Sequence, residues 1–378
     1  MTQGTLLVAA FLGTFMFGVF SAFWGMVVPE IEKKLGKAAT ILLANSVGLV
    51  IGSLISGPLI DQQGTKVTLA LGIGLVAVGV FGLTRVGSLA PGFVMALLVG
   101  IGGSAIVTAA NALVPQIATT DEARGLWGNI VNNFFAVGAF VAPLALSRMI
   151  AKGTSLRSIG NVLGVMALII FGYYLVISFP PPPAVGSSLT EGAGQVLSSG
   201  LFWILALMLL LYVGCEGTVW YWLNKYMTQE LGIEAKAAGN TVSLFAIGII
   251  VGRIISSYLL GGGVMGPLPL TLIGAIGIAI TYTGLLFVRG LGAVRLLAVL
   301  AGVSMAPMFP TILAATGIHF TQNTGTAIGL AITGGWLGYV FIPPSIGYFK
   351  NLRTGMFITS GAAVLLVVAN FIALGMVR

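Results

Sequence analysis

Long apolar runs alternate with short polar stretches along the whole chain. Each run holds about twenty hydrophobic residues, and charges, prolines or clustered glycines separate one run from the next. A helix needs about 20 apolar residues to cross a hydrocarbon core of ~30 Å, whereas a membrane-spanning strand needs only about ten alternating ones. Because the runs are long and continuous, the pattern predicts transmembrane helices.

Dividing the chain at the polar stretches predicts twelve spans, six on each side of a linker. The spans are Thr5–Val28, Thr40–Ile60, Val67–Val86, Gly92–Val114, Leu126–Ile150, Ser158–Phe179, Leu201–Tyr226, Ala237–Leu260, Leu268–Val288, Val294–Ile318, Thr324–Phe349 and Thr354–Val377. Four prolines and a Gly/Ser-rich stretch predict the linker, which crosses one membrane face. We expect an N-terminal six-helix bundle over residues 1–179, an inter-domain linker over 180–200 and a C-terminal six-helix bundle over 201–378.

The two halves repeat each other at an offset of two hundred residues. The repeated positions are Gly48/Gly248, Gly52/Gly252, Ser56/Ser256, Gly125/Gly325, Gly138/Gly338 and Pro143/Pro343, and Trp24 recurs at a slightly shorter offset as Trp220. A parallel repeat of apolar segments indicates two similar membrane halves with a substrate path between them. The repeat therefore favours a transporter.

Composition places the chain in a cell inner (plasma) membrane as a multi-pass protein. The 378 residues are 57% hydrophobic and 7% charged, with a mean hydropathy of +1.08, whereas soluble domains carry about 25% charged residues. The formal charge is +8, but the bases stand singly, which argues against a nucleic-acid partner. The lone Cys215 excludes a disulfide within the chain, and the first span favours a retained helix over a signal peptide.

A polar loop in the first half carries the most specific motif. It reads Gly57-Pro-Leu-Ile-Asp61-Gln-Gln-Gly64-Thr-Lys66. This loop is similar to the signature G-x-L-x-D-x-x-G-x-K of the major facilitator superfamily, and six helices, a linker and six similar helices is the layout of that superfamily. The resemblance implies an all-α membrane protein with twelve transmembrane helices in two six-helix pseudo-symmetric bundles.

The loop motif also predicts a conformational latch. Gly57 would let two helices approach closely, and Gly64 suits a tight turn. Asp61 could meet a neighbouring helix N-terminus or a base, with Lys66 as the basic member of the motif. The equivalent loop of the second half, residues 261–266, has neither acid nor base.

Three further stretches resemble the fucose permease branch, which carries fucose, glucose and galactose. Residues 212–223 are similar to its Y-V-G-x-E motif followed by W-L, residues 305–311 to A-P-x-F-P-T, and residues 129–139 to an Asn-containing pattern ending in F-x-x-x-G-A. The fucose permeases couple transport to protons through carboxylates in the first and fourth helices. This chain has none there, so that kind of coupling does not carry over.

Glu216 is the only acid near the middle of a predicted span. A charge at that depth costs about 2.5–3.5 kcal/mol on the insertion scale, so the carboxyl should face a cavity, stay protonated or hold a cation. It could carry a coupling proton, bind Na⁺ or accept a hydrogen bond from a sugar hydroxyl; the alternative is a neutral carboxyl that fixes its helix. Arg253 lies deep in the eighth span and could bind main-chain carbonyls or an anionic substrate.

Amides and aromatic rings complete the predicted substrate site. Asn129, Asn132 and Asn133 share one helix face, and amides match sugar hydroxyls without a charge; interhelical packing is the alternative. The predicted substrate-binding residues are Trp24, Asn129, Asn132, Glu216, Trp220, Asn224 and Trp336. For the tryptophans an interfacial aromatic belt stays open as the other interpretation, and Trp222 is a weaker candidate.

The distribution of bases conflicts with the orientation that the loop motif implies. The motif places the Asp61 loop in the cytoplasm, yet the loops on that side hold chiefly Lys66 and Arg124. The opposite loops hold Lys33, Lys34, Lys37, Arg85, Lys152, Arg157, Lys225, Lys236, Arg289, Arg295, Lys350 and Arg353. The positive-inside rule alone would reverse the orientation. We follow the motif because a ten-residue match is more specific than a compositional bias.

The sequence predicts a secondary active transporter of a small polar solute, a hexose or deoxyhexose, that works by alternating access with H⁺ or Na⁺ symport. Alternatives are an exporter of drugs or metabolites by proton antiport, an uncoupled uniporter, and a non-transporting receptor or scaffold. Without a metal cluster, a nucleophile–His pair or a phosphate loop in the sequence, we expect no enzyme activity, no metal and no cofactor besides a coupling ion. The expected partners are the bilayer and the substrate, and the expected state is a monomer.

Overall fold

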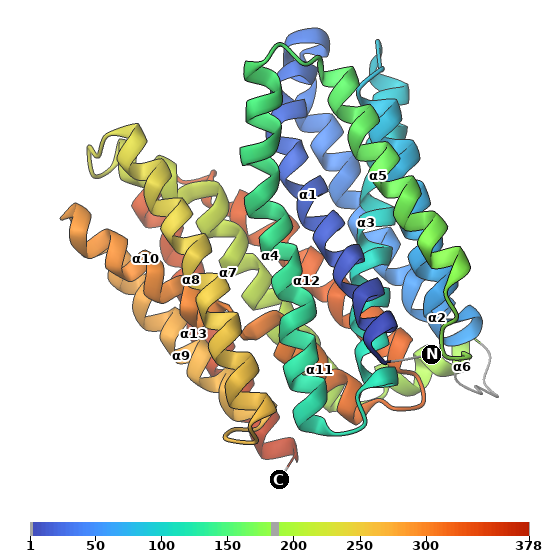
Figure 1. The fold of residues 1–378 in the computed structure, drawn as a ribbon. Helices are drawn as coiled ribbons and strands as arrows, with labels where there is room; N and C mark the ends of the chain where they lie inside the picture. Colours follow the sequence, from blue (N-terminus) through green and yellow to red (C-terminus); the bar gives the residue numbers. More distant parts are fainter. Residues whose placement is uncertain (1–2, 183–188, 378) are drawn as a thin grey trace. The chain divides into compact units, whose positions relative to one another are not determined.

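The computed structural model describes residues 3–182 and 189–377, which form thirteen helices and no strand (Figure 1). The helices are α1 (Gln3–Leu35), α2 (Ala38–Leu83), α3 (Leu89–Ile117), α4 (Asp121–Ala151), α5 (Leu156–Val176), α6 (Leu189–Leu197), α7 (Gly200–Gln229), α8 (Ala235–Gly261), α9 (Pro267–Leu285), α10 (Leu291–Met305), α11 (Met308–His319), α12 (Thr324–Ile346) and α13 (Leu352–Val377). Every predicted span coincides with a helix or a helix pair, but the spans that end at Val86, Phe179, Val288 and Phe349 extend past the ends of their helices, which are Leu83, Val176, Leu285 and Ile346.

These helices make twelve membrane spans. The 46 residues of α2 would extend about 69 Å, more than twice the ~30 Å of a hydrocarbon core, so α2 holds two spans. Gly64 separates them, because its φ of 85° is non-helical. The pair α10 and α11 forms one apolar segment, Leu291–His319, and the nine residues of α6 are too short to cross. The predicted twelve-helix, all-α architecture is therefore confirmed.

Several boundaries differ from the prediction. Helix α1 continues past Val28 to Leu35, because its charged last turns lengthen the helix beyond its apolar run. Helix α6 lies inside the predicted linker, where the Gly/Ser-rich composition predicted no helix; residues 183–188 of that linker lie outside the described residues. The tenth span breaks between α10 and α11, immediately before Pro307, whose ring prevents a continuous helix.

Contacts group the chain into two compact units that do not follow the sequence halves. Unit 1 comprises Met1–Ile117, Phe134–Val196 and Phe320–Thr333, and unit 2 comprises Ala118–Asn133, Leu197–His319 and Gly334–Arg378. Helices α4 and α12 are thus each shared between the units. The division into bundles at residues 179 and 201 stays a prediction.

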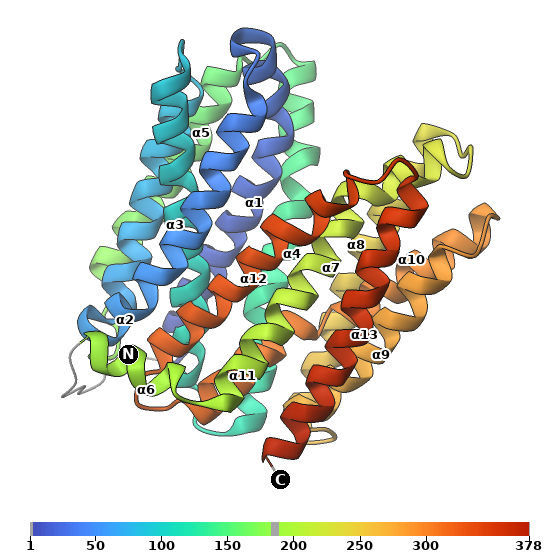
Figure 2. The same cartoon turned by 180° about the vertical axis from the view of Figure 1, so that it is seen from behind.

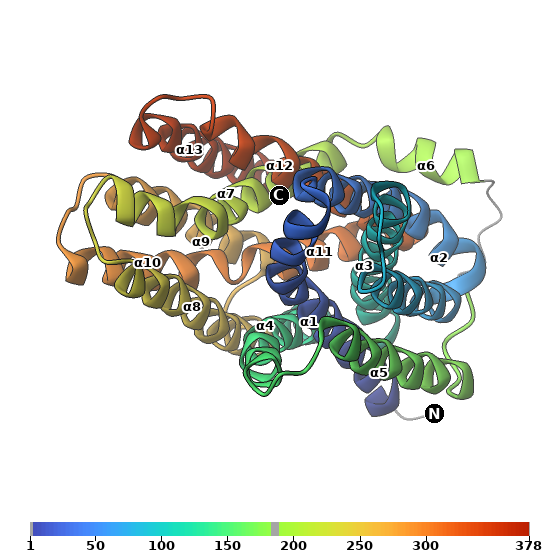
Figure 3. The same ribbon diagram turned by 90° about the horizontal axis from the view of Figure 1, so that it is seen from above.

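Small residues let the helices of each unit pack closely. In unit 1, α2 lies beside α3 in every view (Figures 2 and 3), and a Cβ on Gly52 would lie 2.5 Å from the carbonyl oxygen of Ile101. In unit 2, α8 packs on α10 in the same way, and a Cβ on Gly252 would lie 2.7 Å from the carbonyl oxygen of Val303. The repeated glycines therefore make equivalent helix contacts in the two units.

Candidate functional site

Two faces of α7 have different roles. Glycines on one face admit side chains of α12: a Cβ on Gly217 would lie 2.8 Å from the ring of Tyr339. The positions of Tyr212, Glu216 and Trp220 follow an i, i+4, i+8 spacing, which places them together on another face. The Tyr-Val-Gly-x-Glu-Gly sequence thus combines close helix packing with a polar and aromatic stripe.

Glu216 is half-buried among aromatic residues. The indole Nε1 of Trp220 donates to Glu216 Oε1 at 3.3 Å, and the Trp220 ring packs edge-on against Phe245 at 5.2 Å between centroids. Tyr212 and Tyr339 lie within electrostatic reach of the Glu216 carboxyl. Among the side chains that the structure describes, the one ion pair within 4 Å joins Arg124 to Asp121, so Glu216 has no direct basic partner among them.

Arg253 of α8 reaches the polar face of α4. Its side chain is buried, and Nη1 donates to the main-chain carbonyl of Asn132 at 2.6 Å. The sequence left two partners open for Arg253, main-chain carbonyls or an anionic substrate, and this contact is of the first kind. The buried Tyr212 lies within electrostatic reach of both Arg253 and Glu216. No ion pair within 4 Å therefore joins Arg253 to Glu216.

The asparagines of α4 lie on one face, as their spacing predicts. Asn129 is fully buried, and its Nδ2 donates to the carbonyl of Gly125 at 3.0 Å and to Thr311 Oγ1 of α11 at 3.3 Å. Asn132 Nδ2 donates to the carbonyl of Gly128 at 2.9 Å. The carbonyl oxygens Oδ1 of Asn129 and Asn133 are buried and have no hydrogen-bond partner among the described residues. This face therefore keeps free acceptors for a hydroxyl-bearing ligand.

The remaining predicted binding residues are less clustered. Trp336 of α12 is half-buried in unit 2, and Asn224 is an exposed residue near the end of α7. Trp24 is half-buried in α1, which belongs to unit 1. Trp222 has a structural contact instead: its Nε1 donates at 2.7 Å to the carbonyl of Pro343, one of the carbonyls in the last turn of α12 that lack a helical partner.

The predicted latch residues meet helix ends in unit 1. Asp61 is 5% exposed, and its Oδ1 and Oδ2 accept hydrogen bonds from the main-chain N–H groups of Gly325 at 2.8 Å and Thr326 at 2.7 Å. These are the second and third residues of α12, whose N–H groups have no helical acceptor. Asp61 therefore caps α12 from another helix, and its negative charge lies at the positive end of the helix dipole.

The other motif residues make this contact possible. A Cβ on Gly57 would lie 2.6 Å from the carbonyl oxygen of Gly325, so only glycine fits without a shift. Gly64 adopts a left-handed φ of 85°. Lys66 Nζ donates to the carbonyls of Leu175 and Ile177 at 2.8 and 2.9 Å, at the negative C-terminal end of α5.

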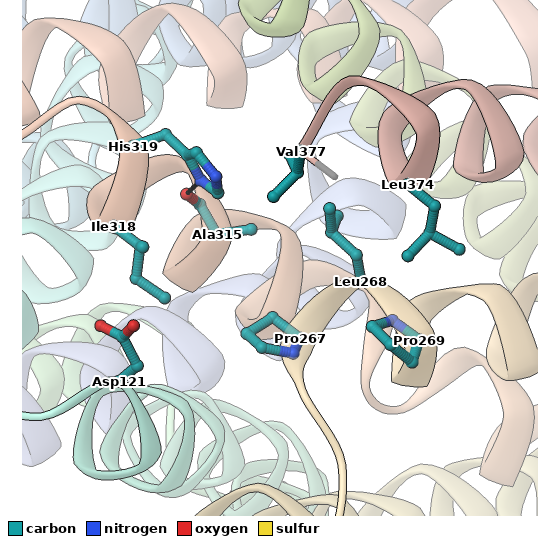
Figure 4. A pocket seen from close by; sticks show the side chains of 9 residues that line it. All are labelled: Asp121, Pro267, Leu268, Pro269, Ala315, Ile318, His319, Leu374 and Val377. Atoms are coloured by element: carbon teal, nitrogen blue, oxygen red, sulfur yellow. Dashed lines mark hydrogen bonds between the residues drawn. The ribbon is translucent and has the colours of Figure 1, made fainter.

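A pocket of about 340 Å³ opens at the end of unit 2 where α9 begins (Figure 4). Its lining is mainly apolar, from Pro267, Leu268 and Leu374 among others. Its polar groups are Asp121 and His319, whose Nδ1 lies 2.8 Å from the carbonyl of Ala315. None of the predicted substrate-binding residues lines this pocket.

A family model described as Major Facilitator Superfamily matches residues 7–343. The chain belongs to the major facilitator superfamily. It is therefore a multi-pass protein of the inner (plasma) membrane with a transporter fold. Members of this superfamily are transporters rather than enzymes, which agrees with the expectation that the chain has no enzyme activity.

Relatives in sequence are distant. The chain is 21% identical over 354 residues to an uncharacterised transporter of this superfamily from Yersinia pestis, covering 91% of this chain and 88% of that protein. It is 23% identical over 312 residues to the uncharacterised transporter YfkL of Bacillus subtilis, covering 81% and 78%. It is 25% identical over 293 residues to the membrane sensor protein UhpC of Salmonella typhimurium, covering 67% and 63%.

Solved structures share the fold over nearly the whole chain. The transporter FucP in its outward conformation matches with a TM-score of 0.83 and 17% identity, covering 97% of this chain and 98% of FucP. The proton:xylose symporter XylE matches with a TM-score of 0.79 and 16% identity, covering 97% and 94%. The resemblance to a fucose permease that the sequence motifs indicate is thereby confirmed at the level of fold.

Sequence reasoning missed three members of the site. Tyr212 and Tyr339 flank Glu216, and Thr311 binds Asn129. A signal was present for Tyr212, because it stands four residues before Glu216 on the same helix. Tyr339 and Thr311 come from other helices, and the spacing along one helix carries no information about them.

Proposed function

We propose that this transporter carries a monosaccharide by alternating access, in symport with H⁺ or Na⁺. The observation that carries the proposal is Glu216: a half-buried carboxyl midway along α7, with no basic side chain within 4 Å in the described part of the chain. A carboxyl in that position can exchange a proton or ligate a cation at low cost in local reorganisation. The ionisable side chains within electrostatic reach of Glu216 include Tyr212 and Tyr339.

The surroundings of Glu216 suit a sugar. Aromatic rings offer an apolar surface for the C–H face of a pyranose, as Trp220 and Tyr339 can beside this carboxyl. Amide and hydroxyl groups on α4 and α11 can match several sugar hydroxyls. Two structures of the same fold are described as a fucose:proton symporter and a proton:xylose symporter, which supports this substrate class.

Uptake by the purified protein in proteoliposomes tests the coupling. We expect an inward pH or Na⁺ gradient to drive hexose accumulation in the wild type. Glu216→Gln should abolish gradient-driven uptake and keep sugar counterflow, because counterflow needs no net movement of the coupling ion. Glu234→Gln is the matched control, since Glu234 is exposed and makes no side-chain cap at α8. Uptake that depends on neither the pH gradient nor the Na⁺ gradient would contradict symport and indicate an uncoupled uniporter.

A sensor is the second candidate. The relative UhpC is described as a membrane sensor protein, so a superfamily member of this kind could bind a solute without carrying it. Hexose-dependent stabilisation of the purified protein with no counterflow would identify a sensor. Stabilisation by lipophilic cations instead of sugars would favour a drug exporter.

A further inference from the structure

Arg253 has no acidic side chain within 4 Å among the described side chains. It is 4% exposed, its Nη1 donates to one main-chain carbonyl, and its Nε has no partner among the described residues. Buried charges are normally paired with an opposite charge, because an uncompensated charge is costly away from water. A carbonyl dipole offsets only part of that cost.

The fold itself does not require this charge. The repeat counterpart of Arg253 is Ser53, whose Oγ lies 2.8 Å from Thr333 Oγ1 within unit 1. A neutral hydroxyl pair thus fills the equivalent place between α2 and α12. The arginine of unit 2 is a feature added to one half only, as expected for a group that acts on a ligand.

Unsatisfied polar atoms lie on the elements around Arg253. Asn129 Oδ1 and Asn133 Oδ1 on α4 are buried without a hydrogen-bond partner among the described residues. Asn132, which lies between the two, supplies the carbonyl that Arg253 binds. Unpaired acceptors on the helix that Arg253 contacts, together with a guanidinium that has no carboxylate partner, suit a ligand with both hydroxyl groups and a negative charge.

One end of unit 2 is strongly basic. The loops and flanking turns that join α7 to α8, α9 to α10 and α12 to α13 carry the bases Lys225, Lys236, Arg289, Arg295, Lys350 and Arg353 against the acids Glu230 and Glu234. The opposite end of the unit carries Asp121, Glu122 and Arg124. A surplus of one sign on a surface raises the local concentration of ligands of the other sign near that surface. Attraction of an anion also gives a physical reason for bases that the positive-inside rule does not explain.

We propose that the substrate is a monosaccharide that bears one carboxylate, a sugar acid, and that Arg253 is its counter-ion. The guanidinium can bind a carboxylate through two parallel hydrogen bonds. A single buried cation balances one negative charge, whereas a phosphate ester carries about −1.5 to −2. The inference rests on the proposed function, because it specifies which sugars the same site takes.

Counterflow in proteoliposomes with paired solutes tests the inference. D-glucose and D-galactose are compared with D-glucuronate and D-galacturonate, which differ from them only in a carboxylate at C6, and with glucose 6-phosphate. We expect the wild type to exchange at least one uronate in preference to its neutral partner and to the phosphate ester. Arg253→Gln should lower uronate exchange by about 30-fold or more, and should lower neutral hexose exchange by a much smaller factor.

Two further variants keep the result interpretable. Arg253→Lys retains the charge but not the bidentate fork, so it should keep part of the uronate exchange even if Arg253→Gln folds poorly. Arg148→Gln removes an exposed arginine of α4 in unit 1 and should exchange uronate like the wild type. Wild-type exchange of neutral hexoses or of the phosphate ester in preference to uronates would overturn the inference. Exchange of neutral hexoses alone would leave the proposed function standing, whereas no sugar exchange at all would remove both.

Discussion

Two helix junctions related by the repeat are closed by different physical means. In unit 1 the acid junction joins Gly57 and Asp61 of α2 to Gly325 and Thr326 of α12 through two charge-assisted hydrogen bonds. In unit 2 the equivalent leucine junction is closed by apolar contact. It is formed by Leu260 and Gly261 of α8 with Gly125 and Leu126 of α4. There each leucine packs against the glycine of the other helix.

The difference lies in how the helix that begins at each junction is capped. This helix is α12 at the acid junction and α4 at the leucine junction. Helix α4 has its own cap: the N–H of Ala123 donates to Thr120 Oγ1 at 3.2 Å, and Asp121 and Glu122 occupy the first turn. Helix α12 has no acid in its first turn, and Asp61 binds the N–H groups that a local cap would bind. A locally capped helix can move away from its neighbour without losing the acceptors of its N-terminal N–H groups. Helix α12 would lose these acceptors, because they belong to Asp61 of α2. The acid junction should therefore resist opening more strongly.

Asp61→Ala should have the largest effect. It removes two hydrogen bonds to a charged acceptor and leaves two buried N–H groups unpaired, which should lower the free energy of unfolding by about 3–6 kcal/mol. Denaturant titration of the detergent-purified protein measures this loss, and proteoliposome uptake should fall with it. The control, Asp121→Ala in the first turn of α4, should cost no more than about 1 kcal/mol. Equal losses in the two variants would contradict the comparison.

Gly57→Ala should come next. The added Cβ would lie 2.6 Å from the carbonyl oxygen of Gly325 and 2.9 Å from the Cα of Thr326, so α2 and α12 must move apart. We expect a loss of about 1–3 kcal/mol in the free energy of unfolding, measured in the same titration. Gly172→Ala is the matched control, because no atom lies within 4 Å of a Cβ at Gly172. Stability unchanged in Gly57→Ala would show that the junction is looser than its geometry indicates.

Leu126→Ala should weaken the leucine junction only moderately. Leu126 is half-buried, so truncation should cost about 1 kcal/mol, below the range for fully buried leucines. The cap of α4 should persist, since Thr120 and Ala123 are untouched. Hydrogen exchange of the Ala123 amide measures cap persistence, and denaturant titration measures the cost. Faster exchange at Ala123 would mean that the cap depends on the junction after all.

Lys66→Gln should have the smallest effect. Lys66 is half-exposed and binds two carbonyls at the end of α5, so its contribution should be below about 1 kcal/mol and should shrink as salt screens the charge. Comparing the wild type and the variant at low and high ionic strength measures this dependence. Lys66→Arg should behave like the wild type. A difference that does not change with salt would assign the effect to packing instead.

The sequence predicted the helices well because their signal is local. Twenty apolar residues in a row specify a span regardless of its neighbours, and the repeated glycines at 48 and 248 pointed to equivalent close contacts. The continuous path of α2 through Gly64 was less predictable, because a polar loop and a bent helix have the same composition. Helix α6 was missed for a similar reason, since the glycines within it and the serines on either side of it predicted an irregular linker.

The site was predictable only in part. Glu216 and the asparagine face follow from spacing on single helices, and Asp61 was expected to meet a helix N-terminus or a base. The identity of that N-terminus depends on which helices are neighbours, although the missing acid in the first turn of α12 was a usable signal. Trp222 illustrates the limit: its sequence position suits a sugar site, yet in the structure its indole N–H binds the carbonyl of Pro343.

The sharing of α4 and α12 between the units limits how the polypeptide can be divided. A cut in the linker would separate Phe320–Thr333 from the rest of unit 1 and Ala118–Asn133 from the rest of unit 2. Each fragment would then lack a length of helix that completes its own core. Co-produced fragments should consequently assemble into a protease-resistant pair, whereas either fragment alone would be degraded, so the gene cannot be split into two self-sufficient proteins.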